Sequence, residues 1–205
     1  MILVSVISVQ NFLVSSFIET IKIVDGKIFH IEYHQKRYEN VLESLNVKDI
    51  QNLVDYINPP EWGLYRCRLV YDFDSIEVTY HEYKKREINS LKLIFDNEID
   101  YTHKSTNRDI LDSMFSKKDE ADDILIIKDL LVTDTSIANI ALYRDGIWHT
   151  PKNPLLKGTT RERLLQEGKI IERDIQVHEL RSFSQVALLN AMIDFDILER
   201  CDFLI

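Results

Sequence analysis

Lys104 is the side chain in this sequence best placed to act as a nucleophile. It lies in the polar segment of residues 103–108, which follows an apolar stretch and precedes an amphipathic one. A lysine in a loop is ordinarily solvated and charged. Near the end of a strand in an enclosed site its pKa falls, and the neutral amine can then form a Schiff base with a carbonyl group. The segment alone is compatible with both interpretations.

Asp134 is the second candidate, because it stands among small polar residues between two apolar stretches. A carboxylate in such a place usually accepts hydrogen bonds from the backbone of its own turn. Buried in a site, the same carboxylate would instead keep a pyridine nitrogen protonated, so that the ring could store electrons.

Two further positions could bind an anion. Residues 158–161 open a predicted helix in which Thr159 and Glu162 are spaced as a capping box and Gly168 fits a left-handed C-terminal position. Capping alone explains these residues, but the free N–H groups at a helix start also bind phosphate. Arg37 lies beside the apolar face of an earlier predicted helix, where it is either a surface arginine or a clamp for phosphate oxygens.

Predicted strands and helices position these candidates. In the front half, residues 17–24 and 28–31 form a predicted hairpin around the Asp-Gly turn at 25–26. Apolar spacing predicts helices at residues 38–45 and 47–57, the second ended by two prolines. Later apolar runs predict strands at 65–71, 75–83, 91–95, 124–127, 130–133, 139–143 and 147–150, and helices at 109–117 and 158–168. The irregular alternation favours an α+β fold with a helix-rich front half and a second half built mainly on strands.

The composition narrows the classes of function. With 205 residues, 45% of them hydrophobic, the chain can fill one sizeable domain or two small ones. Its net charge of −9 without a basic run argues against a nucleic acid or membrane partner. Its two cysteines support neither a disulfide framework nor a metal site, and a reducing, cytoplasmic location is the simplest interpretation. Residues 1–18 are apolar but lack a basic start and a cleavage site, which favours buried strands over a signal or anchor.

The order and spacing of these segments resemble the class IV aminotransferases, the fold family of branched-chain aminotransferase, D-amino acid aminotransferase and 4-amino-4-deoxychorismate lyase. The matching segments are colinear over nearly the whole chain: residues 17–20, the hairpin 21–31, His34-x-x-Arg37, 104–108, 133–140, Asp145-Gly146, 150–151, 155–161 and 189–191. The resemblance implies a D-amino acid aminotransferase-like fold that depends on pyridoxal 5′-phosphate (PLP). It places a smaller N-terminal α/β domain at residues 1–96 and a larger, strand-rich PLP-binding domain at 97–205.

The resemblance also implies a role for each matching residue. Lys104 would form the Schiff base and move protons at the substrate α-carbon, and Asp134 would pair with the pyridine nitrogen. The residues implied to bind or cover the cofactor phosphate are Arg37, Thr159, Thr160, Asn190 and Ala191. The implied enzyme is a homodimer that acts on a small-molecule amino-group substrate.

Departures from the family pattern leave the reaction open. Asp134 stands where the family usually has glutamate, and residues 14–16 replace a Gly-Asp-Gly. The chain also begins close to the first matching strand. We therefore expect its substrate-facing walls to differ from those of the family. The segment after Lys104 lacks the tyrosine of branched-chain aminotransferases, which favours a lyase that converts 4-amino-4-deoxychorismate to 4-aminobenzoate and pyruvate. The alternatives are a transaminase for branched-chain or D-amino acids and a relative that binds PLP without catalysis.

Overall fold

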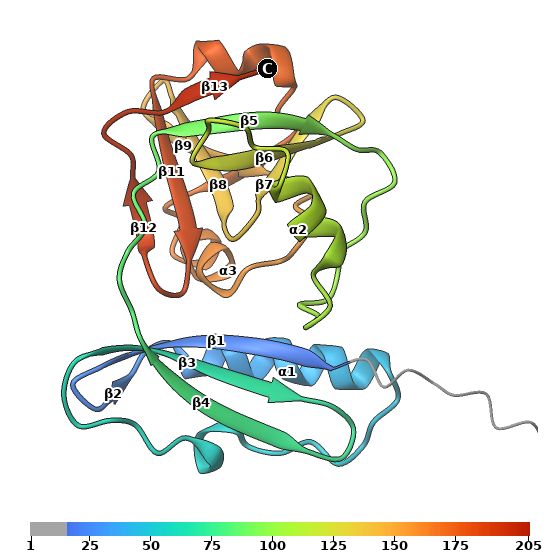
Figure 1. Ribbon diagram of the computed structural model, residues 1–205, viewed down its shortest axis with the longest axis vertical. Coiled ribbons are helices and arrows are strands. Elements are labelled where there is room, and N and C mark those ends of the chain that lie inside the picture. Colours follow the sequence, from blue (N-terminus) through green and yellow to red (C-terminus); the bar gives the residue numbers. More distant parts are fainter. Residues whose placement is uncertain (1–15) are drawn as a thin grey trace, which may run out of the picture.

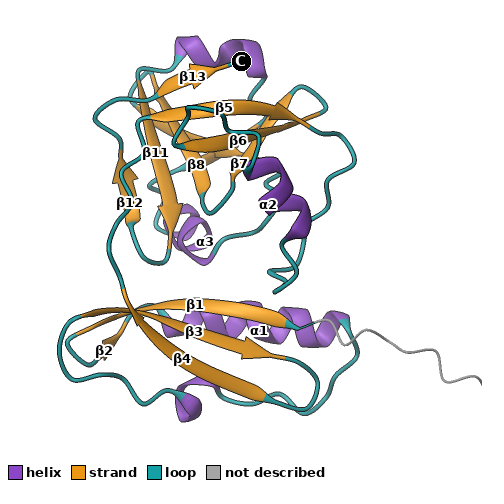
Figure 2. Cartoon of the chain, viewed as in Figure 1, coloured by secondary structure: helices purple, strands orange, loops and turns teal. Residues whose placement is uncertain are grey.

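Two β-sheets, one above the other in Figure 1, make up most of the computed structural model, which describes residues 16–205. Residues 1–15, which hold most of the apolar N-terminal run discussed above, lie outside the described part. Strands predominate in the upper layer, and the lower layer combines a small sheet with one long helix (Figure 2). The fold class is α+β, as predicted.

The smaller sheet is antiparallel, with the strand order β2-β1-β3-β4. Its strands are β1 (Phe17–Val24), β2 (Lys27–Ile28), β3 (Leu64–Tyr71) and β4 (Ile76–Glu82). The predicted turn is confirmed, because Asp25 and Gly26 have φ of 47° and 76°, the positive values that a two-residue hairpin favours. Strand β2 is shorter than predicted, since helix α1 (Ile31–Ser44) begins soon after it.

Helix α1 covers one face of this sheet. Alternate side chains of β1 point toward the helix, so Phe17, Ile21 and Ile23 are buried together with Tyr38 and Leu42. The apolar face predicted from sequence spacing is therefore confirmed. The opposite face of the sheet is turned toward the second half of the chain (Figure 1).

The second helix, predicted over residues 47–57, is wrong. The segment contains only a short 3₁₀ turn, η1 (Leu53–Tyr56). Gln35 of α1 explains the difference, because its side chain accepts the N–H of Leu53 (2.8 Å) and donates to the carbonyl of Gln51 (3.0 Å). Such tertiary hydrogen bonds override a helical spacing of apolar residues. The front half is consequently less helical than predicted.

The larger sheet has nine strands, seven of them in the order β10-β9-β8-β7-β6-β5-β13, while β11 pairs with β8 and carries β12. They are β5 (Ser90–Phe95), β6 (Asp123–Lys128), β7 (Leu131–Thr135), β8 (Asn139–Arg144), β9 (Ile147–Pro151), β10 (Ile171–Arg173), β11 (Gln185–Asn190), β12 (Asp194–Ile197) and β13 (Asp202–Leu204). Strand β6 is buried on both faces. Leu125 and Ile127 join the central core, whereas Ile124 and Ile126 pack against helix α2 (Asp109–Phe115), which explains the continuous apolar run.

Helix α3 (Thr159–Gln166) begins differently from the prediction. The predicted capping box is wrong, because Gly158 is the N-cap and Thr159 is already helical, with no side-chain capping bond. The predicted helix end is confirmed. Gly168 has φ of 66°, and the N–H groups of Gly168 and Lys169 donate to the carbonyls of Leu165 and Leu164. The second 3₁₀ segment, η2 (Val177–Ser182), follows β10.

The chain passes from the smaller to the larger sheet between Glu82 and Ser90. The domain boundary predicted at residues 96 and 97 therefore falls after β5, the first strand of the larger sheet. Strand β5 pairs with β6 and β13, which lie far downstream in the sequence, and the division into two domains stays a prediction.

The segment around Lys104 connects the two sheets. Ile18 N–H donates to the Lys104 carbonyl (2.9 Å), Thr106 N–H donates to the Ser16 carbonyl (2.9 Å), and Phe17 forms a β-bridge with Ser105. In Figure 1 the loop before α2 accordingly reaches down to β1.

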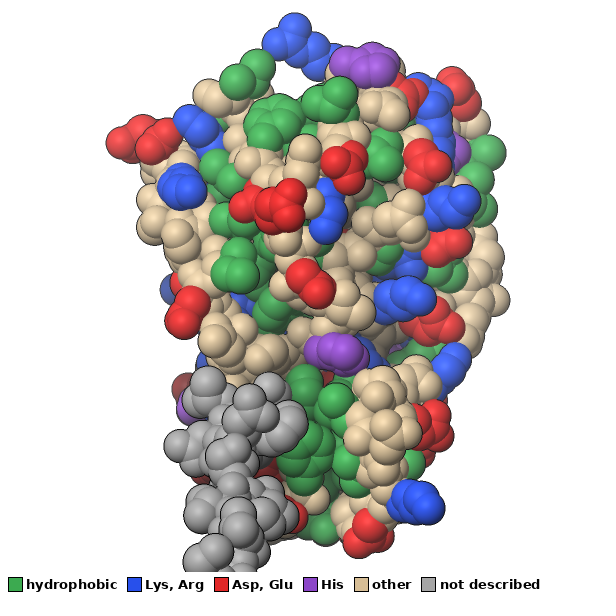
Figure 3. Space-filling model, turned by 90° about the vertical axis from the view of Figure 1, so that its right-hand side faces the viewer, with side chains coloured by type: hydrophobic (Ala, Val, Ile, Leu, Met, Phe, Trp, Pro, Cys, Tyr) green, Lys and Arg blue, Asp and Glu red, His purple; other side chains and the backbone are tan. Residues whose placement is uncertain are grey.

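The outer surface mixes charges. On the face drawn in Figure 3, acidic and basic side chains are interspersed rather than gathered into one basic field. Within residues 16–205, the helices are all too short or too polar to span a lipid bilayer.

Candidate active site

A cavity of about 360 Å³ is lined by side chains from both sheets and from the loops between them. Six of the seven residues singled out in the sequence line it: Arg37, Lys104, Asp134, Thr159, Asn190 and Ala191. The seventh, Thr160, is buried and lines a neighbouring cavity of about 330 Å³, which shares Ala191 with the first. Residues that are distant in the sequence thus meet in one place.

Lys104 lies in this cavity with its backbone fixed to β1. Burial lowers the pKa of its amine to about 8, and the positive charges of Arg37 and Arg108 act in the same direction. The carboxylates of Glu19 and Asp134 oppose this shift without cancelling it. A substantial fraction of the amine is therefore neutral near physiological pH, which is the form that attacks a carbonyl carbon.

Arg37 is held by a buried carboxylate. Glu19, fully buried on β1, accepts two hydrogen bonds from the Arg37 guanidinium (2.6 and 2.7 Å) and one from Nδ1 of His34 (2.6 Å). Burial by itself raises the pKa of a carboxyl group, but Arg37 and His34 hold that of Glu19 at about 2. The bidentate geometry fixes one edge of the guanidinium and orients the arginine at the cavity wall.

Glu19 was not recognised as a site residue from the sequence, although a signal for it exists. The alternation of β1 buries Phe17, Ile21 and Ile23, and Glu19 is the charged residue in the same register. A carboxylate on a buried face requires a positive partner. The helical segment with His34 and Arg37 supplies one.

Asp134 of β7 is buried in the part of the cavity wall that the larger sheet contributes. Its Oδ1 accepts a hydrogen bond from Nδ2 of Asn139 (2.7 Å), and its Oδ2 accepts one from the N–H of Leu156 (2.9 Å). Burial raises the pKa of Asp134 to about 6, although these two donors and Arg161 favour the charged form. A nearby cationic group, such as a protonated ring nitrogen, would compensate this buried carboxylate.

Gly158 is needed for the close approach of α3 to this carboxylate. A Cβ at position 158 would lie 2.0 Å from Oδ1 of Asn139. Asn139 also donates to the carbonyl of Leu156 (2.8 Å), so it links the start of α3 to Asp134. Within residues 16–205, no hydrogen-bond acceptor is found for the N–H groups of Thr159 and Thr160, which leaves them available to an anion.

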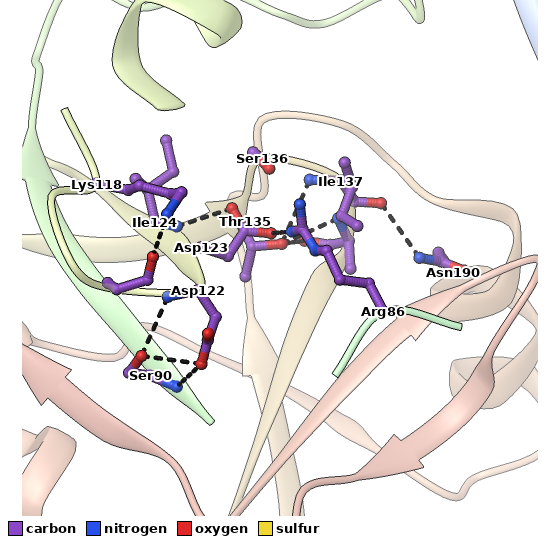
Figure 4. Close-up of polar contacts among 12 residues, drawn as sticks. Arg86, Ser90, Lys118, Asp122, Asp123, Ile124, Thr135, Ser136, Ile137 and Asn190 are labelled. Carbon is purple, nitrogen blue, oxygen red and sulfur yellow. Dashed lines mark hydrogen bonds and ion pairs between the residues drawn. The ribbon is translucent and has the colours of Figure 1, made fainter. Parts of the chain in front are cut away.

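Thr135, Ser136 and Ile137, in the turn that follows Asp134, line another part of the wall. Figure 4 shows these three residues beside Asn190. The Thr135 hydroxyl closes this turn by accepting the N–H of Ala138 (3.0 Å). Asn190 of β11 donates to the carbonyl of Ile137 (3.4 Å), and Arg108 donates to the carbonyl of Ser136 (2.9 Å). The predicted site residue Asn190 is thus tied to the turn next to Asp134.

Sequence inspection also overlooked two arginines on β3, Arg66 and Arg68, which line the cavity together with Tyr83. Within residues 16–205, no group of three or more histidine, cysteine or acidic side chains is arranged to hold a metal ion. The described site therefore combines an amine of lowered pKa, a buried carboxylate and a helix start with free N–H groups. An aromatic aldehyde that carries a phosphate, such as PLP, has complementary groups for all three.

Comparison with known proteins places this chain among related sequences and structures. A family model described as "Amino-transferase class IV" matches residues 16–195. An uncharacterized protein from Haemophilus influenzae is 35% identical over 180 residues, which make up 85% of this chain and 96% of that protein.

Solved structures share the fold. A "putative 4-amino-4-deoxychorismate lyase" from Haemophilus somnus 129pt superposes with a TM-score of 0.82 at 33% identity, covering 89% of this chain and 98% of that one. A "putative amino-acid aminotransferase" from Mesorhizobium loti superposes with a TM-score of 0.80 at 20% identity, covering 93% and 100%. At 20% identity the similarity concerns the fold alone.

We expect Gly158→Ala to disturb the carboxylate side of the site. The added methyl group displaces Asn139, so the unfolding free energy should fall by about 1–3 kcal/mol, as measured by urea denaturation. The matched control is a double-mutant cycle with Asn139→Ala, which removes the clashing atoms. The double variant should lose less stability than the sum of the single losses, and additive losses would argue against the clash.

Acid stability should depend on Glu19. Its pKa is lowered from 4.5 to about 2, so its contribution is fully present above pH 4.5 and is lost as the pH falls through about 2. That difference corresponds to roughly 3 kcal/mol. In urea denaturation, Glu19→Gln should be less stable than wild type at pH 7, and the two curves of unfolding free energy should converge toward pH 2. Curves that stay parallel would contradict this role.

Proposed function

Because this chain belongs to the amino-transferase class IV family, whose members are PLP-dependent enzymes, we propose that it binds PLP in the cavity between its two sheets. The observation that carries this proposal is the meeting of Lys104, Asp134 and Arg37 in one cavity. These residues come from the connecting loop, the larger sheet and helix α1, so their meeting is a property of the fold rather than of one segment.

Each group of the chain would hold a different part of the cofactor. The Lys104 amine would bind its aldehyde carbon, and the Asp134 carboxylate would hold a proton on its ring nitrogen. Arg37 and the N–H groups at the start of α3 would bind its phosphate. When bound, PLP supplies an electron sink next to the substrate carbon that carries the amine.

The pKa of Lys104 suits it to proton transfer as well as to binding. Burial and the neighbouring arginines lower the pKa of its amine to about 8, so its Nζ would serve as the base that accepts the proton of the amine-bearing substrate carbon. Asp134 is one methylene shorter than the glutamate usual in the family. Asn139 and the Leu156 N–H hold both of its oxygens, which limits how far this shorter side chain can move.

For the reaction we propose the lyase, with 4-amino-4-deoxychorismate as substrate. The 33% identity with the lyase-named structure from Haemophilus somnus, over 98% of that chain, supports this choice. Lys104 would remove the proton from the amine-bearing ring carbon, and the bond from the neighbouring ring carbon to the enolpyruvyl oxygen would break. The ring becomes aromatic as 4-aminobenzoate, and the enolpyruvate takes up a proton to give pyruvate.

Transamination of branched-chain or D-amino acids is the second candidate, because the family takes its name from amino transfer. Incubation of the purified holoenzyme with single amino acids separates the two reactions. Release of a keto acid with conversion of the cofactor to its amine form indicates transamination. Release of 4-aminobenzoate from aminodeoxychorismate, without reaction of any amino acid, indicates the lyase. If the protein retains PLP but shows neither reaction, it is a binding protein without catalysis. We also propose a homodimer, which light scattering would test.

We expect Lys104→Ala to abolish turnover while the protein still folds. Borohydride reduction of the wild-type holoenzyme should fix the cofactor on the peptide that contains Lys104, as seen by mass spectrometry, and the variant should show no such attachment. Lys48→Ala is the control, because Lys48 is exposed in the segment after α1 and does not line the cavity, and this variant should behave as wild type. Near-normal turnover by Lys104→Ala would move the catalytic role to another residue.

Asp134→Asn should keep the cofactor but slow the proton transfer at the substrate. A neutral amide cannot stabilise a protonated ring nitrogen, so single-turnover rates should fall by about 10-fold or more, without loss of the visible absorbance of bound PLP. The conservative variant Asp134→Glu should recover part of the rate. An unchanged rate in Asp134→Asn would show that Asp134 serves only to fix the turn.

A further inference from the structure

Arg66 and Arg68 are unusual among the arginines of this chain. Of the eleven arginines in residues 16–205, eight form an ion pair with an acidic side chain: Arg37, Arg86, Arg108, Arg144, Arg161, Arg163, Arg173 and Arg200. Arg66, Arg68 and Arg181 are without such a pair among the described residues. Arg181 is exposed and lies outside the cavity, whereas the exposed Arg66 and the half-buried Arg68 both line it.

The strand register directs both arginines into the cavity. Cys67 and Leu69 of β3 are fully buried against the core under α1, so Arg66 and Arg68 belong to the opposite face of the sheet. Arg68 lies opposite Thr20 of β1, which also lines the cavity.

Neighbouring positions on this face add no compensating charge. Arg66 lies between Lys22 of β1 and His81 of β4, and Arg68 lies between two threonines. Glu77 of β4 is the acidic residue on the same face, but it is exposed and does not line the cavity. The sheet therefore presents a basic surface to the site in a chain whose net charge is −9.

The other two arginines of the cavity already have acidic partners. Among its lining residues, Arg37 is paired with Glu19 and Arg108 with Asp112, and Asp134 is the single carboxylate. PLP would add its phosphate at the start of α3 and next to Arg37. The two guanidinium groups on β3 would keep their positive charge on the wall of the cavity, which suits this side of the site to a second anion.

The sheet geometry separates these arginines from the reactive lysine. The Lys104 carbonyl is bound to Ile18, which lies opposite Val70. Arg68 and Arg66 are two and four residues from Val70, so their backbones lie about 7 and 14 Å further along the sheet, at about 3.4 Å per residue. An anion bound by these arginines would therefore lie well away from the substrate amine that reacts near Lys104.

We propose that Arg66 and Arg68 bind a substrate carboxylate that lies across a ring from the reacting amine. This inference rests on the proposed function and narrows the substrate class to amino-substituted rings with a distal carboxylate. The planar guanidinium groups suit a carboxylate geometrically, since each can donate two parallel hydrogen bonds. Tyr83, whose side chain lines the same cavity, supplies a hydroxyl donor beside Arg66.

The test compares two ligands of the same shape, 4-aminobenzoate and the neutral 4-aminobenzamide. Their affinities for the PLP-loaded enzyme are measured by calorimetry for wild type, Arg66→Gln, Arg68→Gln and the double variant. Wild type should prefer the carboxylate by at least about tenfold, because charge-assisted hydrogen bonds distinguish the two. The double variant should lose this preference. Arg181→Gln, which removes the same charge outside the cavity, is the matched control and should keep it.

Several outcomes would overturn the inference. One is a carboxylate preference that survives in the double variant. Another is loss of bound PLP from the double variant alone, which would assign the arginines to the cofactor phosphate. If the double variant does not fold, the single variants and Arg68→Lys decide, since lysine keeps the charge and should retain part of the preference. The binding assay requires no turnover. If the protein makes no 4-aminobenzoate but still shows the arginine-dependent preference for the carboxylate, only the proposed lyase reaction is disproved.

Discussion

The hydrogen bond from the Ile18 N–H to the Lys104 carbonyl joins the two halves of the molecule at the position where the chemistry is expected. The loop of Lys104 leaves the larger sheet, but β1 of the smaller sheet fixes its backbone, and the bridge between Phe17 and Ser105 continues this pairing. The cavity exists because these two units meet. Their relative position therefore determines where the lysine amine stands with respect to Asp134, which belongs to the larger sheet alone.

A second constraint is the burial of charge. Glu19, His34 and Arg37 bring a carboxylate, an imidazole and a guanidinium into the interior, and such groups are costly unless every one of them is paired. Apolar residues of similar volume in place of a buried ion pair are often at least as stabilising. What the buried ion pair provides is a guanidinium with a defined orientation at the cavity. Asp134 is the complementary case, a buried carboxylate whose amide partners are neutral and whose pKa is correspondingly high.

The sequence predicted local structure correctly where the conformation depends on a few neighbouring residues. The Asp25-Gly26 turn, the apolar face of α1 and the left-handed Gly168 follow from local rules, and they were correctly predicted. Local rules failed where contacts with residues distant in the sequence determine the conformation. This applies to residues 47–57, which Gln35 binds, and to the start of α3, which packs against Asn139. The same limit applies to the site. Family resemblance identified six residues of the cavity lining, but the role of Glu19 and the direction of Arg66 become apparent only when β1 and β3 are seen side by side.

Strand β5 is synthesised long before β13, one of the two strands between which it lies in the larger sheet. Residues of β1 to β4 and α1 are complete once the chain has passed Glu82, so the smaller sheet and its helix can fold early during synthesis. Strand β5 comes next, but one of its two neighbours is β13, the last strand described. Until that strand arrives, β5 presents an open edge with unpaired N–H and C=O groups, the kind of edge on which nascent chains associate. The larger sheet is therefore completed later in synthesis than the smaller one.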